Sequence, residues 1–461
     1  MGLGSRYSRK FESQLLDRFV LTEFGLSFLC TFSAMFCFWI SAYTIHTGLV
    51  IYGVACMIGF MIGLEIPLIT RINQAYEPLR ENISSVMEFD YYGALLGGAL
   101  FAFVLLPFLG LTYTPVLLGG LNLLVVSLVL WYFPDRLARP RIFKAQFAGL
   151  LVASVLAFAV AKPIILHGEQ HKYKDKIVYE EQTRYQKIVV TQWKDDYWLF
   201  INGSTQFSTY DEERYHEPLV HPLMGLIEER KDILLLGGGD GLAAREILKY
   251  PDVKNLTLVD LDPAMTQLAR KNDIFLGINQ GSLNDPRVRV VNQDAYQFIN
   301  NSGDLYDAII VDLPDPKSVS LSLLYSLGFY KMVEKHLKPF GAMVTQSTSP
   351  LYSPEAFLCI KKTMEFAGFS TLPYQNSIPS MGQWGWVLGV RQKAMPAQRL
   401  KQDLTALEFA DIETRFLNRD AMISMVHFGK GLFEKEDIIE PNTQFDHNIL
   451  KYYRQGSWDL Y

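Results

Sequence analysis

The sequence predicts a multi-pass α-helical membrane domain, then a small β domain, then an α/β domain with a Rossmann-like sheet. Apolar runs of bilayer-spanning length gather in the first third of the 461 residues. Two segments of alternating polarity follow, which is typical of a half-buried hairpin. From residue 233 onward strands and helices alternate, which predicts a mostly parallel sheet covered by helices. The domain boundaries we infer are 1–165, 176–225 and 226–395, with a C-terminal extension at 396–461.

The composition sets few limits on function. Hydrophobic residues make up 49% of the chain, charged residues 20%, and the net charge is −5. No strongly basic face or Lys/Arg-rich tail is present, so we expect no nucleic-acid partner. The four cysteines show neither a disulfide framework nor zinc-ligand spacing.

Five apolar runs predict five membrane-spanning helices. They are too long and too many for a secretory signal. The glycine-rich segment GALLGG at 93–98 lets helices approach closely, which fits a homo-oligomer. Glu65, in GLEIPLI, is either an end-of-helix residue near the interface or a buried functional carboxylate. The runs cover about 24–46, 49–69, 91–109, 113–133 and 143–161.

The basic residues that flank these runs predict a membrane orientation that conflicts with a cytoplasmic C-terminal half. Lys and Arg cluster at 6–18 and 136–144, while the short turns between other runs have none. The positive-inside rule places both clusters in the cytoplasm. Five crossings then put the C-terminal half outside, away from any cytosolic ligand. Three explanations of this conflict stay open: one run does not cross fully, the charge bias misleads, or further helices lie upstream.

The second half of the chain reads as a hairpin followed by alternating strands and helices. YQKIVVTQW and YWLFING, separated by KDD, predict the hairpin, and DEERYHEPLVHPLMGLI favours a helix. The strands that follow are ILLLG, LTLVDLD, VRVVNQD and YDAIIVDLPDP, with helices from about 242, from 263 and after residue 294. Ligands of such sheets bind at the carboxyl ends of the strands, where the strand order reverses.

Polar clusters stand at each of those carboxyl ends. GGGDG follows the first strand, Asp260 and Asp262 end the second, Asp294 ends the third, and Asp312 with Asp315 ends the fourth. A glycine-rich turn with an acid about 20 positions later indicates a ribose-binding nucleoside site. Carboxylates repel phosphate, and the loop has no Lys or Arg. A cationic nucleoside such as S-adenosylmethionine or its decarboxylated form fits this edge best.

Other polar residues are predicted to be structural. Asp262 is expected to cap the next helix, because the proline after it suits the first helical position. Glu246 is expected at the surface. His216 and His221 lie five apart in a helical stretch, which is poor geometry for a metal pair, so no metal site is predicted.

Several motifs together resemble the spermidine and spermine synthases, the polyamine aminopropyltransferases. They are GGGDGLAAREILK, VDLDP, DPRVRVVNQDA and YDAIIVDLPDP, and their order holds from about 178 to 390. GLEIPLI and FDYYGALLGGALF resemble the bacterial branch of this family that carries an N-terminal membrane domain. Longer members have further helices ahead of a segment like MGLGS. The resemblance implies a catalytic domain like that of S-adenosylmethionine-dependent methyltransferases.

The resemblance also implies a role for each site residue, with no cofactor and no metal. Asp312 corresponds to the base that deprotonates the attacking amine, and Asp260 to the acid that grips the ribose of decarboxylated S-adenosylmethionine. Asp294 would accept from the adenine amino group. The acceptor amine would be held by Asp315, Tyr215 and His216. The other donor-binding positions are Gln186, Gln206, Gly237, Gly239, Asp240 and Gly241.

The sequence departs from the family on the acceptor side. A PTYPSG-like segment of soluble members is replaced by SIPSMGQWGW, with Pro379 at the tyrosine position, and Leu313 and Pro314 follow the catalytic acid. Three hypotheses stay open: aminopropyl transfer that releases methylthioadenosine, a lyase that converts S-adenosylmethionine to methylthioadenosine and homoserine lactone, and a membrane sensor of adenosyl compounds or polyamines. We expect a multi-pass protein of the cell (inner) membrane with a cytoplasmic catalytic domain.

Overall fold

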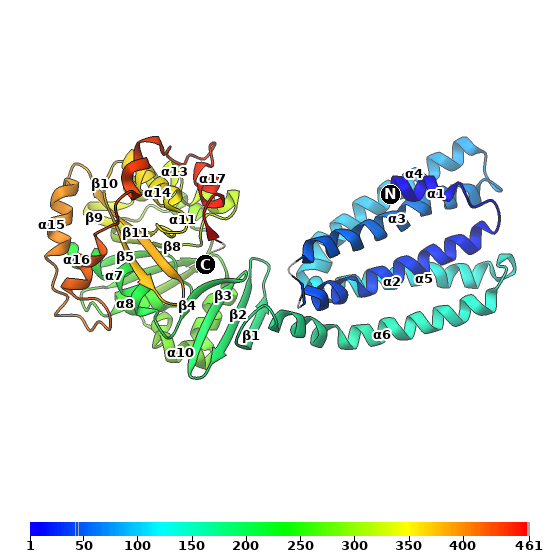
Figure 1. The fold of residues 1–461 in the computed structure, drawn as a ribbon, viewed down its shortest axis with the longest axis horizontal. Coiled ribbons are helices and arrows are strands. Elements are labelled where there is room, and N and C mark those ends of the chain that lie inside the picture. The colour runs from blue at the N-terminus through cyan, green and yellow to red at the C-terminus, as the bar shows by residue number, and fades with distance from the viewer. Residues whose placement is uncertain (42, 45, 459–461) are drawn as a thin grey trace. The chain divides into compact units, whose positions relative to one another are not determined.

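The structure, a computed structural model, describes residues 1–41, 43–44 and 46–458 (Figure 1). The chain forms two compact units, Met1–Ile177 and Val178–Tyr461. We call them the helical unit and the α/β unit, and each is described by itself.

Four of the five predicted apolar runs lie wholly or almost wholly in helices, and the run 24–46 is helical up to Ser41. Among the described residues four helical stretches are long and apolar enough to cross a membrane: Leu15–Ser41, Thr47–Asn73, Leu79–Tyr132 and Pro140–Gln170. The third is 54 residues long and bends back at Gly110, whose φ of 62° and ψ of −170° are not helical. It therefore holds two of the predicted runs. The helices are α1 (Gly2–Ser8), α2 (Leu15–Ser41), α3 (Thr47–Asn73), α4 (Leu79–Leu100), a π-helical segment (Phe101–Leu105), α5 (Leu106–Tyr132) and α6 (Pro140–Gln170).

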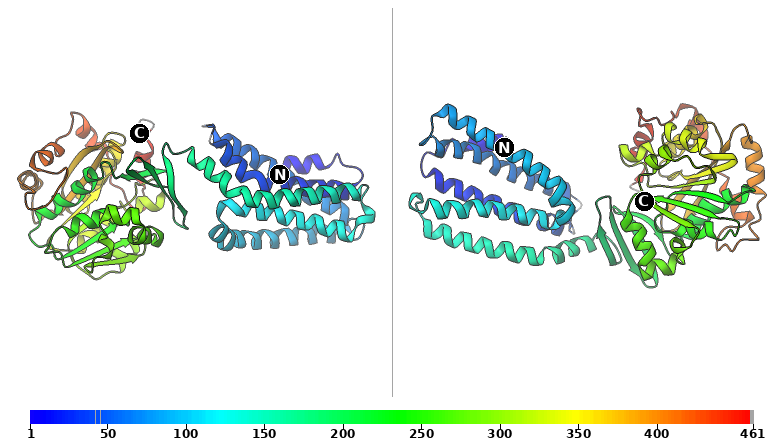
Figure 2. Two further views of the ribbon diagram at one scale, coloured as in Figure 1. Left: turned by 90° about the horizontal axis from the view of Figure 1, so that it is seen from below. Right: turned by 180° about the vertical axis from the view of Figure 1, so that it is seen from behind.

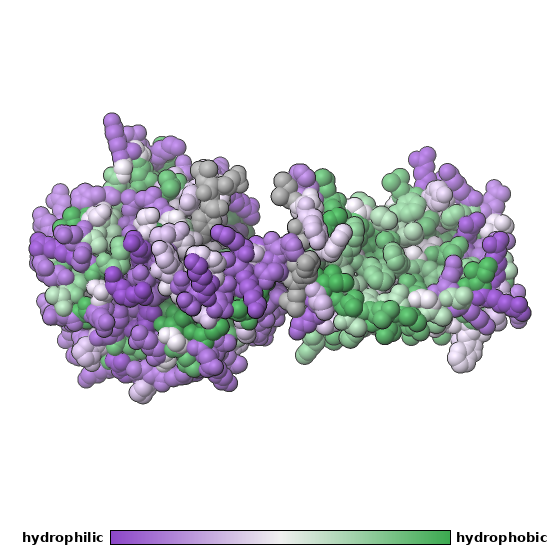
Figure 3. Space-filling view, turned by 60° about the horizontal axis from the view of Figure 1, so that its bottom comes forward, coloured by the Kyte–Doolittle hydropathy of each residue, from purple (hydrophilic) through white to green (hydrophobic). Residues whose placement is uncertain are grey.

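Helix α2 lies at the centre of the helical unit and packs against α3, α5 and α6 (Figure 2). One apolar cluster joins Val20 and Phe24 of α2 to Leu123 and Val126 of α5. The Asp17 carboxylate accepts hydrogen bonds from the Ala138 backbone N–H at 3.1 and 3.2 Å. The two basic segments of the sequence therefore lie at the same end of this unit. Hydrophobic residues cover much of its outer face in the space-filling view (Figure 3).

A small antiparallel sheet opens the α/β unit. Strands β2 and β3 pair with Trp193 opposite Asp196, so the predicted hairpin is confirmed. Lys194, in the turn, takes the left-handed conformation with φ of 56°. The strand order is β1-β2-β3-β4. The strands are β1 (Lys176–Gln182), β2 (Lys187–Trp193), β3 (Asp196–Ile201) and β4 (Ser204–Ser208).

The main sheet has seven strands in the order β10-β11-β9-β8-β5-β6-β7. Strand β5 pairs in parallel with both β6 and β8, so the strand order reverses at β5, as the glycine-rich motif predicts. Strand β11 runs antiparallel to both of its neighbours. The strands are β5 (Asp232–Gly237), β6 (Asn255–Asp260), β7 (Val288–Asn292), β8 (Tyr306–Asp312), β9 (Leu337–Gln346), β10 (Phe369–Ile378) and β11 (Gly382–Arg391).

Both faces of this sheet are covered by helices. Leu235 and Ile310 belong to one apolar cluster, while Leu234 and Ile309, one residue earlier in each strand, belong to the other. Burial on both faces explains why these strands are continuous apolar runs. The larger helices are α7 (Glu213–Leu226), α8 (Leu242–Leu248), α9 (Pro263–Lys271), α10 (Asp273–Asn279), α11 (Ala295–Asn301), α13 (Leu327–Lys335) and α14 (Pro354–Phe366).

The C-terminal extension packs onto the same unit. The buried Glu217 carboxylate of α7 accepts hydrogen bonds from the backbone N–H groups of residues 415–417 at 2.6, 2.9 and 2.7 Å. The extension holds α15 (Ala397–Thr405), α16 (Arg419–Met425), a 3-10 segment (Leu432–Ile438) and α17 (Asn448–Arg454).

One expectation about α8 is wrong. Glu246 is buried, not at the surface, because its carboxylate pairs with His221 at 2.8 Å and with Arg245 at 2.8 Å. His221 also contacts the Tyr250 hydroxyl at 3.1 Å, so it has the structural role expected of it.

Candidate active site

The glycine-rich loop brings the ends of three strands together. Gly237 has a φ of +87°, and a Cβ there would lie 1.9 Å from the Asp312 carbonyl oxygen at the end of β8. A Cβ on Gly239 would lie 2.5 Å from the carboxylate of Asp260 at the end of β6. Any side chain at either position would push these strand ends apart, which is why the loop needs glycine.

Asp260 is held by backbone N–H groups at the mouth of the loop. Its carboxylate accepts from Gly239 at 3.1 Å and from Asp262 at 2.9 Å. Burial raises its pKa to about 6. Asp262 caps α9 as predicted, accepting from the Ala264 N–H at 3.0 Å. Its other oxygen accepts from the Thr183 hydroxyl at 2.8 Å.

Asp240 completes a concentration of negative charge in this region. It lies partly buried in the loop, and its carboxylate accepts a hydrogen bond from the Leu242 N–H at 2.8 Å. Burial raises its pKa. Asp240 also repels both Asp260 and Asp312 electrostatically. Three neighbouring, partly buried carboxylates with raised pKa values therefore favour a cationic ligand.

The remaining donor-side residues form local contacts in the structure. Asp294 caps α11 by accepting from the Gln297 N–H at 2.9 Å. Gln186 lies in the turn between β1 and β2, where its backbone carbonyl accepts from Thr183. Gln206 donates to the Ser204 carbonyl at 3.1 Å. Within the described residues no hydrogen bond links these three to the carboxylate cluster, so their donor-binding roles stay predictions.

Asp312 lies at the carboxyl end of β8 and pairs with a phenol. The Tyr215 hydroxyl of α7 donates to the Asp312 carboxylate at 2.6 Å. Burial raises the pKa of Asp312 to about 6, with the nearby His216 and the Tyr215 hydrogen bond acting in the opposite direction. A carboxylate with this pKa is mostly ionised at neutral pH and can accept a proton.

His216 acts on this centre from one residue further along α7. Its Nδ1 contacts the Glu212 carboxylate at 2.9 Å, and Arg245 also pairs with that carboxylate at 2.8 Å. Burial lowers the pKa of His216, but the Glu212 hydrogen bond and the nearby charges of Glu212, Asp240 and Asp312 together outweigh it, so the pKa is raised. The imidazole in turn favours the ionised form of Asp312. Its contact with an acceptor amine stays a prediction.

Asp315 sits in a buried hydrogen-bond network. The Tyr453 hydroxyl of α17 donates to its carboxylate at 3.0 Å, and the Gln346 amide lies 3.4 Å away. Gln346 also contacts the Tyr325 hydroxyl at 2.5 Å and accepts from the Trp384 indole N–H at 3.3 Å. Burial raises the pKa of Asp315. The network fixes the direction of this second carboxylate.

Four members of this network, Gln346, Tyr325, Trp384 and Tyr453, were not predicted as site residues. Gln346 ends β9, so the strand-end argument that selected Asp312 selects it too. Trp384 lies in the segment that departs from the family pattern. Pro379, in the same segment, is exposed between β10 and β11. Tyr453 lies 138 residues from Asp315, and no local pattern points to it.

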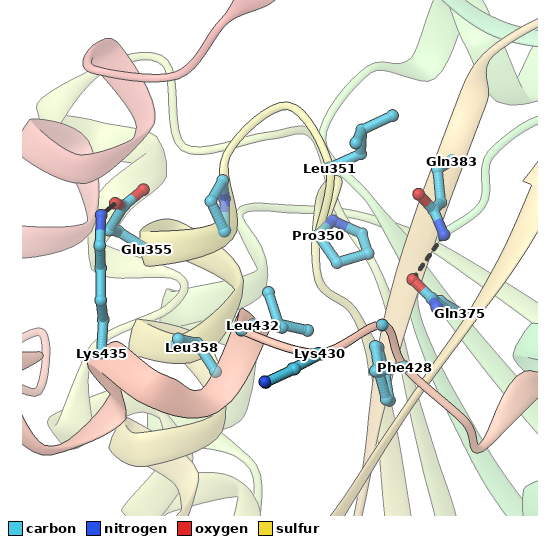
Figure 4. A pocket seen from close by; sticks show the side chains of 13 residues that line it. Pro350, Leu351, Glu355, Leu358, Gln375, Gln383, Phe428, Lys430, Leu432 and Lys435 are labelled. Carbon is cyan, nitrogen blue, oxygen red and sulfur yellow. Dashed lines mark hydrogen bonds and ion pairs between the residues drawn. The ribbon is translucent and has the colours of Figure 1, made fainter.

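A cavity of about 440 Å³ lies away from the carboxylate cluster (Figure 4). Part of its wall comes from α14 and the β10–β11 hairpin, where Gln383 donates to Gln375 at 2.7 Å. Lys430 and Lys435 of the extension also line it, and Lys435 pairs with Glu355 at 3.2 Å. None of the predicted site residues lines this cavity.

The described part of the chain contains no group of three or more His, Cys, Asp and Glu side chains placed to hold a metal ion.

Comparison with known proteins agrees with this geometry. The Spermine/spermidine synthase domain matches residues 212–402. A polyamine aminopropyltransferase of Oceanobacillus iheyensis is 39% identical, over 100% of this chain and 89% of the relative. Polyamine aminopropyltransferase 2 of Aquifex aeolicus is 40% identical, over 98% of this chain and 89% of the relative.

A solved structure shares the fold. The crystal structure of a spermidine synthase in complex with the transition state analogue AdoDATO matches with a TM-score of 0.50 and 23% identity. The match covers 57% of this chain and 89% of that chain. With relatives of this similarity along almost its full length, the chain belongs to the spermine/spermidine synthase family, that of the polyamine aminopropyltransferases.

Proposed function

We propose that this protein transfers an aminopropyl group from decarboxylated S-adenosylmethionine to a polyamine and releases methylthioadenosine. The observation that carries the proposal is the partly buried Asp312 carboxylate, which lies beside the glycine loop and accepts a hydrogen bond from the Tyr215 hydroxyl at 2.6 Å. A second buried carboxylate, Asp315, stands three residues away. The pair can bind an amine and remove its proton.

The reaction is a displacement at carbon. The amine nitrogen attacks the aminopropyl carbon next to the sulfonium, the new C–N bond forms as the C–S bond breaks, and the sulfur leaves as a neutral thioether. The nitrogen must lose a proton to attack. Asp312 takes that proton, because it is largely ionised at neutral pH with a pKa of about 6.

The other carboxylates hold the two cations in position. Asp260 offers acceptors to the ribose hydroxyls, Asp240 faces the positive end of the donor, and Asp315 binds the amine. Holding two mutually repelling cations at attack distance accounts for much of the rate gain in such a reaction. The buried negative charge offsets their repulsion.

Two incubations separate this activity from its alternatives. Full-length protein in detergent is given decarboxylated S-adenosylmethionine with putrescine, or S-adenosylmethionine alone, and the products are identified by mass spectrometry. Methylthioadenosine with spermidine in the first supports the transferase. Methylthioadenosine with homoserine lactone in the second would replace it with a lyase. Binding without turnover in either would favour a sensor.

Asp312→Asn tests the base directly. The amide keeps the size of the side chain but cannot accept the amine proton. We expect turnover to fall by about 10² to 10⁴-fold. The affinity for the donor should stay within about threefold of that of the unchanged protein, because the base acts on the amine proton and not on the bound donor. Asp304→Asn, at an exposed carboxylate before β8, is the matched control. Loss of donor binding would make Asp312 a donor ligand and contradict its role as base.

We propose further that the helical unit crosses the bilayer, so that this is a multi-pass protein of the cell (inner) membrane with the α/β unit in the cytoplasm. Four helical stretches of sufficient length and hydropathy support the crossing. The cytoplasmic position follows from the adenosyl substrate, which is made in the cytosol. Close approach of glycine-rich helices also fits a homo-oligomer.

A further inference from the structure

Two carboxyl groups meet inside the helical unit. Glu23 of α2 is only 4% exposed, Glu65 of α3 is partly buried, and the two carboxyls interact directly. Glu23 comes eight residues after the start of α2 at Leu15, and Glu65 eight residues before the end of α3 at Asn73. At 1.5 Å per residue each lies about 12 Å from its helix end, well inside the span.

No basic side chain compensates these carboxyls. Among residues 1–41, 43–44 and 46–458, no Lys, Arg or His forms an ion pair with Glu23 or Glu65, and Glu23 Oε2 has no hydrogen-bond partner. The nearest basic residues in sequence are engaged elsewhere. The Arg18 guanidinium lies 5.2 Å from the centre of the Phe11 ring, and Arg71 donates to the Ser8 carbonyl at 3.1 Å. Buried acids without a countercharge mark a site that takes up a cation.

Two hydroxyls continue the polar row along α2. Ser27 and Thr31 follow Glu23 by one and two turns, both are fully buried, and neither hydroxyl has a hydrogen-bond partner in the described structure. Hydroxyls in apolar helices ordinarily donate to a carbonyl of their own helix. Five others in α2, α3 and α5 do so: Thr22, Ser33, Ser41, Thr70 and Ser127. Ser154 of α6 is a further buried hydroxyl without a partner among the described residues, but only on α2 do such oxygens, those of Glu23, Ser27 and Thr31, follow one another along one face.

We propose that Glu23, Glu65 and Ser27 form a binding site for an ammonium group of a polyamine. An ammonium has three N–H donors and no acceptor, which matches carboxylates and an unpartnered hydroxyl. Asp90 of α4 lies near enough to Glu65 to repel it electrostatically, so a third negative charge is available for the second amine of a diamine. The ligand class rests on the proposed function of the α/β unit; the existence of a cation site does not.

Equilibrium dialysis with radiolabelled putrescine tests the site in the full-length protein in lipid nanodiscs. The protein carries Asp312→Asn and Asp315→Asn, so that binding at the active site is weakened. We expect one saturable amine site to remain. Glu23→Gln with Glu65→Gln should then weaken it by about tenfold or more, which is the loss expected for charge-assisted hydrogen bonds. Glu81→Gln, at an exposed acid in the first turn of α4, should have no effect.

A milder variant keeps the test valid if the double glutamine variant does not fold. Ser27→Ala should weaken amine binding by a few fold, whereas Ser33→Ala, whose hydroxyl bonds the Cys30 carbonyl at 2.9 Å, should not. Absence of the remaining amine site, or its persistence in the glutamate and serine variants, overturns the proposal. So does a site at the same residues that takes labelled sodium but no amine.

An assay of aminopropyl transfer distinguishes failure of this cation site from failure of the proposed function. With the active-site residues intact, Glu23→Gln with Glu65→Gln should leave aminopropyl transfer at saturating substrate within about twofold, because both acids lie outside the α/β unit. If transfer is absent from the unchanged protein while the amine site persists, the proposed function fails and the cation site stands.

Discussion

Asp312 and Tyr215 set the pH range in which the active site can work. The pKa of Asp312 is raised from 3.8 to about 6, chiefly by burial, and the base must be ionised to act. Transfer should therefore be lost as pH falls through about 6. The Tyr215 hydrogen bond stabilises the ionised form, so Tyr215→Phe should raise the pKa further and move this acidic limb to higher pH.

The measurement is kcat/KM between about pH 5 and 8, which reports the essential groups of the free enzyme and substrate. Tyr374→Phe is the control, because Tyr374 is also buried but its hydroxyl donates to the Pro218 carbonyl at 2.8 Å. If the acidic limb of the kcat/KM profile lies at the same pH in Tyr215→Phe as in the unchanged protein, Asp312 is not the titrating base.

At the scale of elements, α17 contributes to the acceptor side through one hydroxyl. Tyr453 donates to the Asp315 carboxylate at 3.0 Å. Tyr453→Phe should raise the KM for the amine roughly tenfold, the effect of losing one hydrogen bond to a charged group. The kcat and the donor affinity should change by less than about twofold, since only acceptor positioning is affected.

Steady-state kinetics with the amine varied at saturating donor gives this separation of KM from kcat. Tyr452→Phe is the matched control, because the neighbouring hydroxyl accepts from the Glu440 N–H instead. An equal fall in kcat and rise in KM would indicate that Tyr453 supports the whole fold rather than the amine site.

The extension depends on α7 for its attachment. Glu217 accepts three backbone N–H groups of residues 415–417. Glu217→Ala leaves these buried donors without an acceptor, and we expect a loss of about 3 kcal/mol in the free energy of unfolding. Urea denaturation followed by tryptophan fluorescence measures it, with Glu229→Ala at an exposed acid as the control. An unchanged unfolding midpoint would show that other contacts hold the extension.

At the scale of the whole molecule, every predicted site residue lies within the α/β unit. A chain that begins at Lys174 should therefore keep aminopropyl transfer with a kcat within about threefold of the full protein, because distant groups act independently. Soluble expression and the same product assay test this. Loss of turnover in a folded fragment would show that the helical unit contributes to catalysis.

The orientation in the membrane is a second question at this scale. The Asp17 contact with Ala138 places both basic segments at one end of the helical unit. If all five predicted runs cross a bilayer as proposed, a cytoplasmic active site would require these segments outside, against the positive-inside rule. We expect a C-terminal green fluorescent protein fusion to fluoresce, and a cysteine placed at Arg9 to react with an impermeant reagent. An active C-terminal alkaline phosphatase fusion would reverse this orientation.

The sequence by itself determined the parts that depend on local pattern. Alternation of apolar residues located the β2–β3 hairpin, continuous apolar runs located the sheet strands, and the proline after Asp262 identified a helix cap. The meeting of Asp260 and Asp312 around the glycine loop could be predicted because parallel strands place their carboxyl ends at one edge, whereas the role of Asp294 stays a prediction. The same rule covers Gln346, an amide at the end of β9.

Only the tertiary structure decided the contacts between distant segments. Tyr453 contacts Asp315 although 138 residues separate them in the chain. Glu246, expected at the surface, is buried because it pairs with His221 of another helix. Glu23 of α2 interacts with Glu65 of α3. Periodicity records which face of an element is buried but not which other element covers it. Side-chain partners chosen by that packing are therefore absent from the pattern and appear only when the chain is folded.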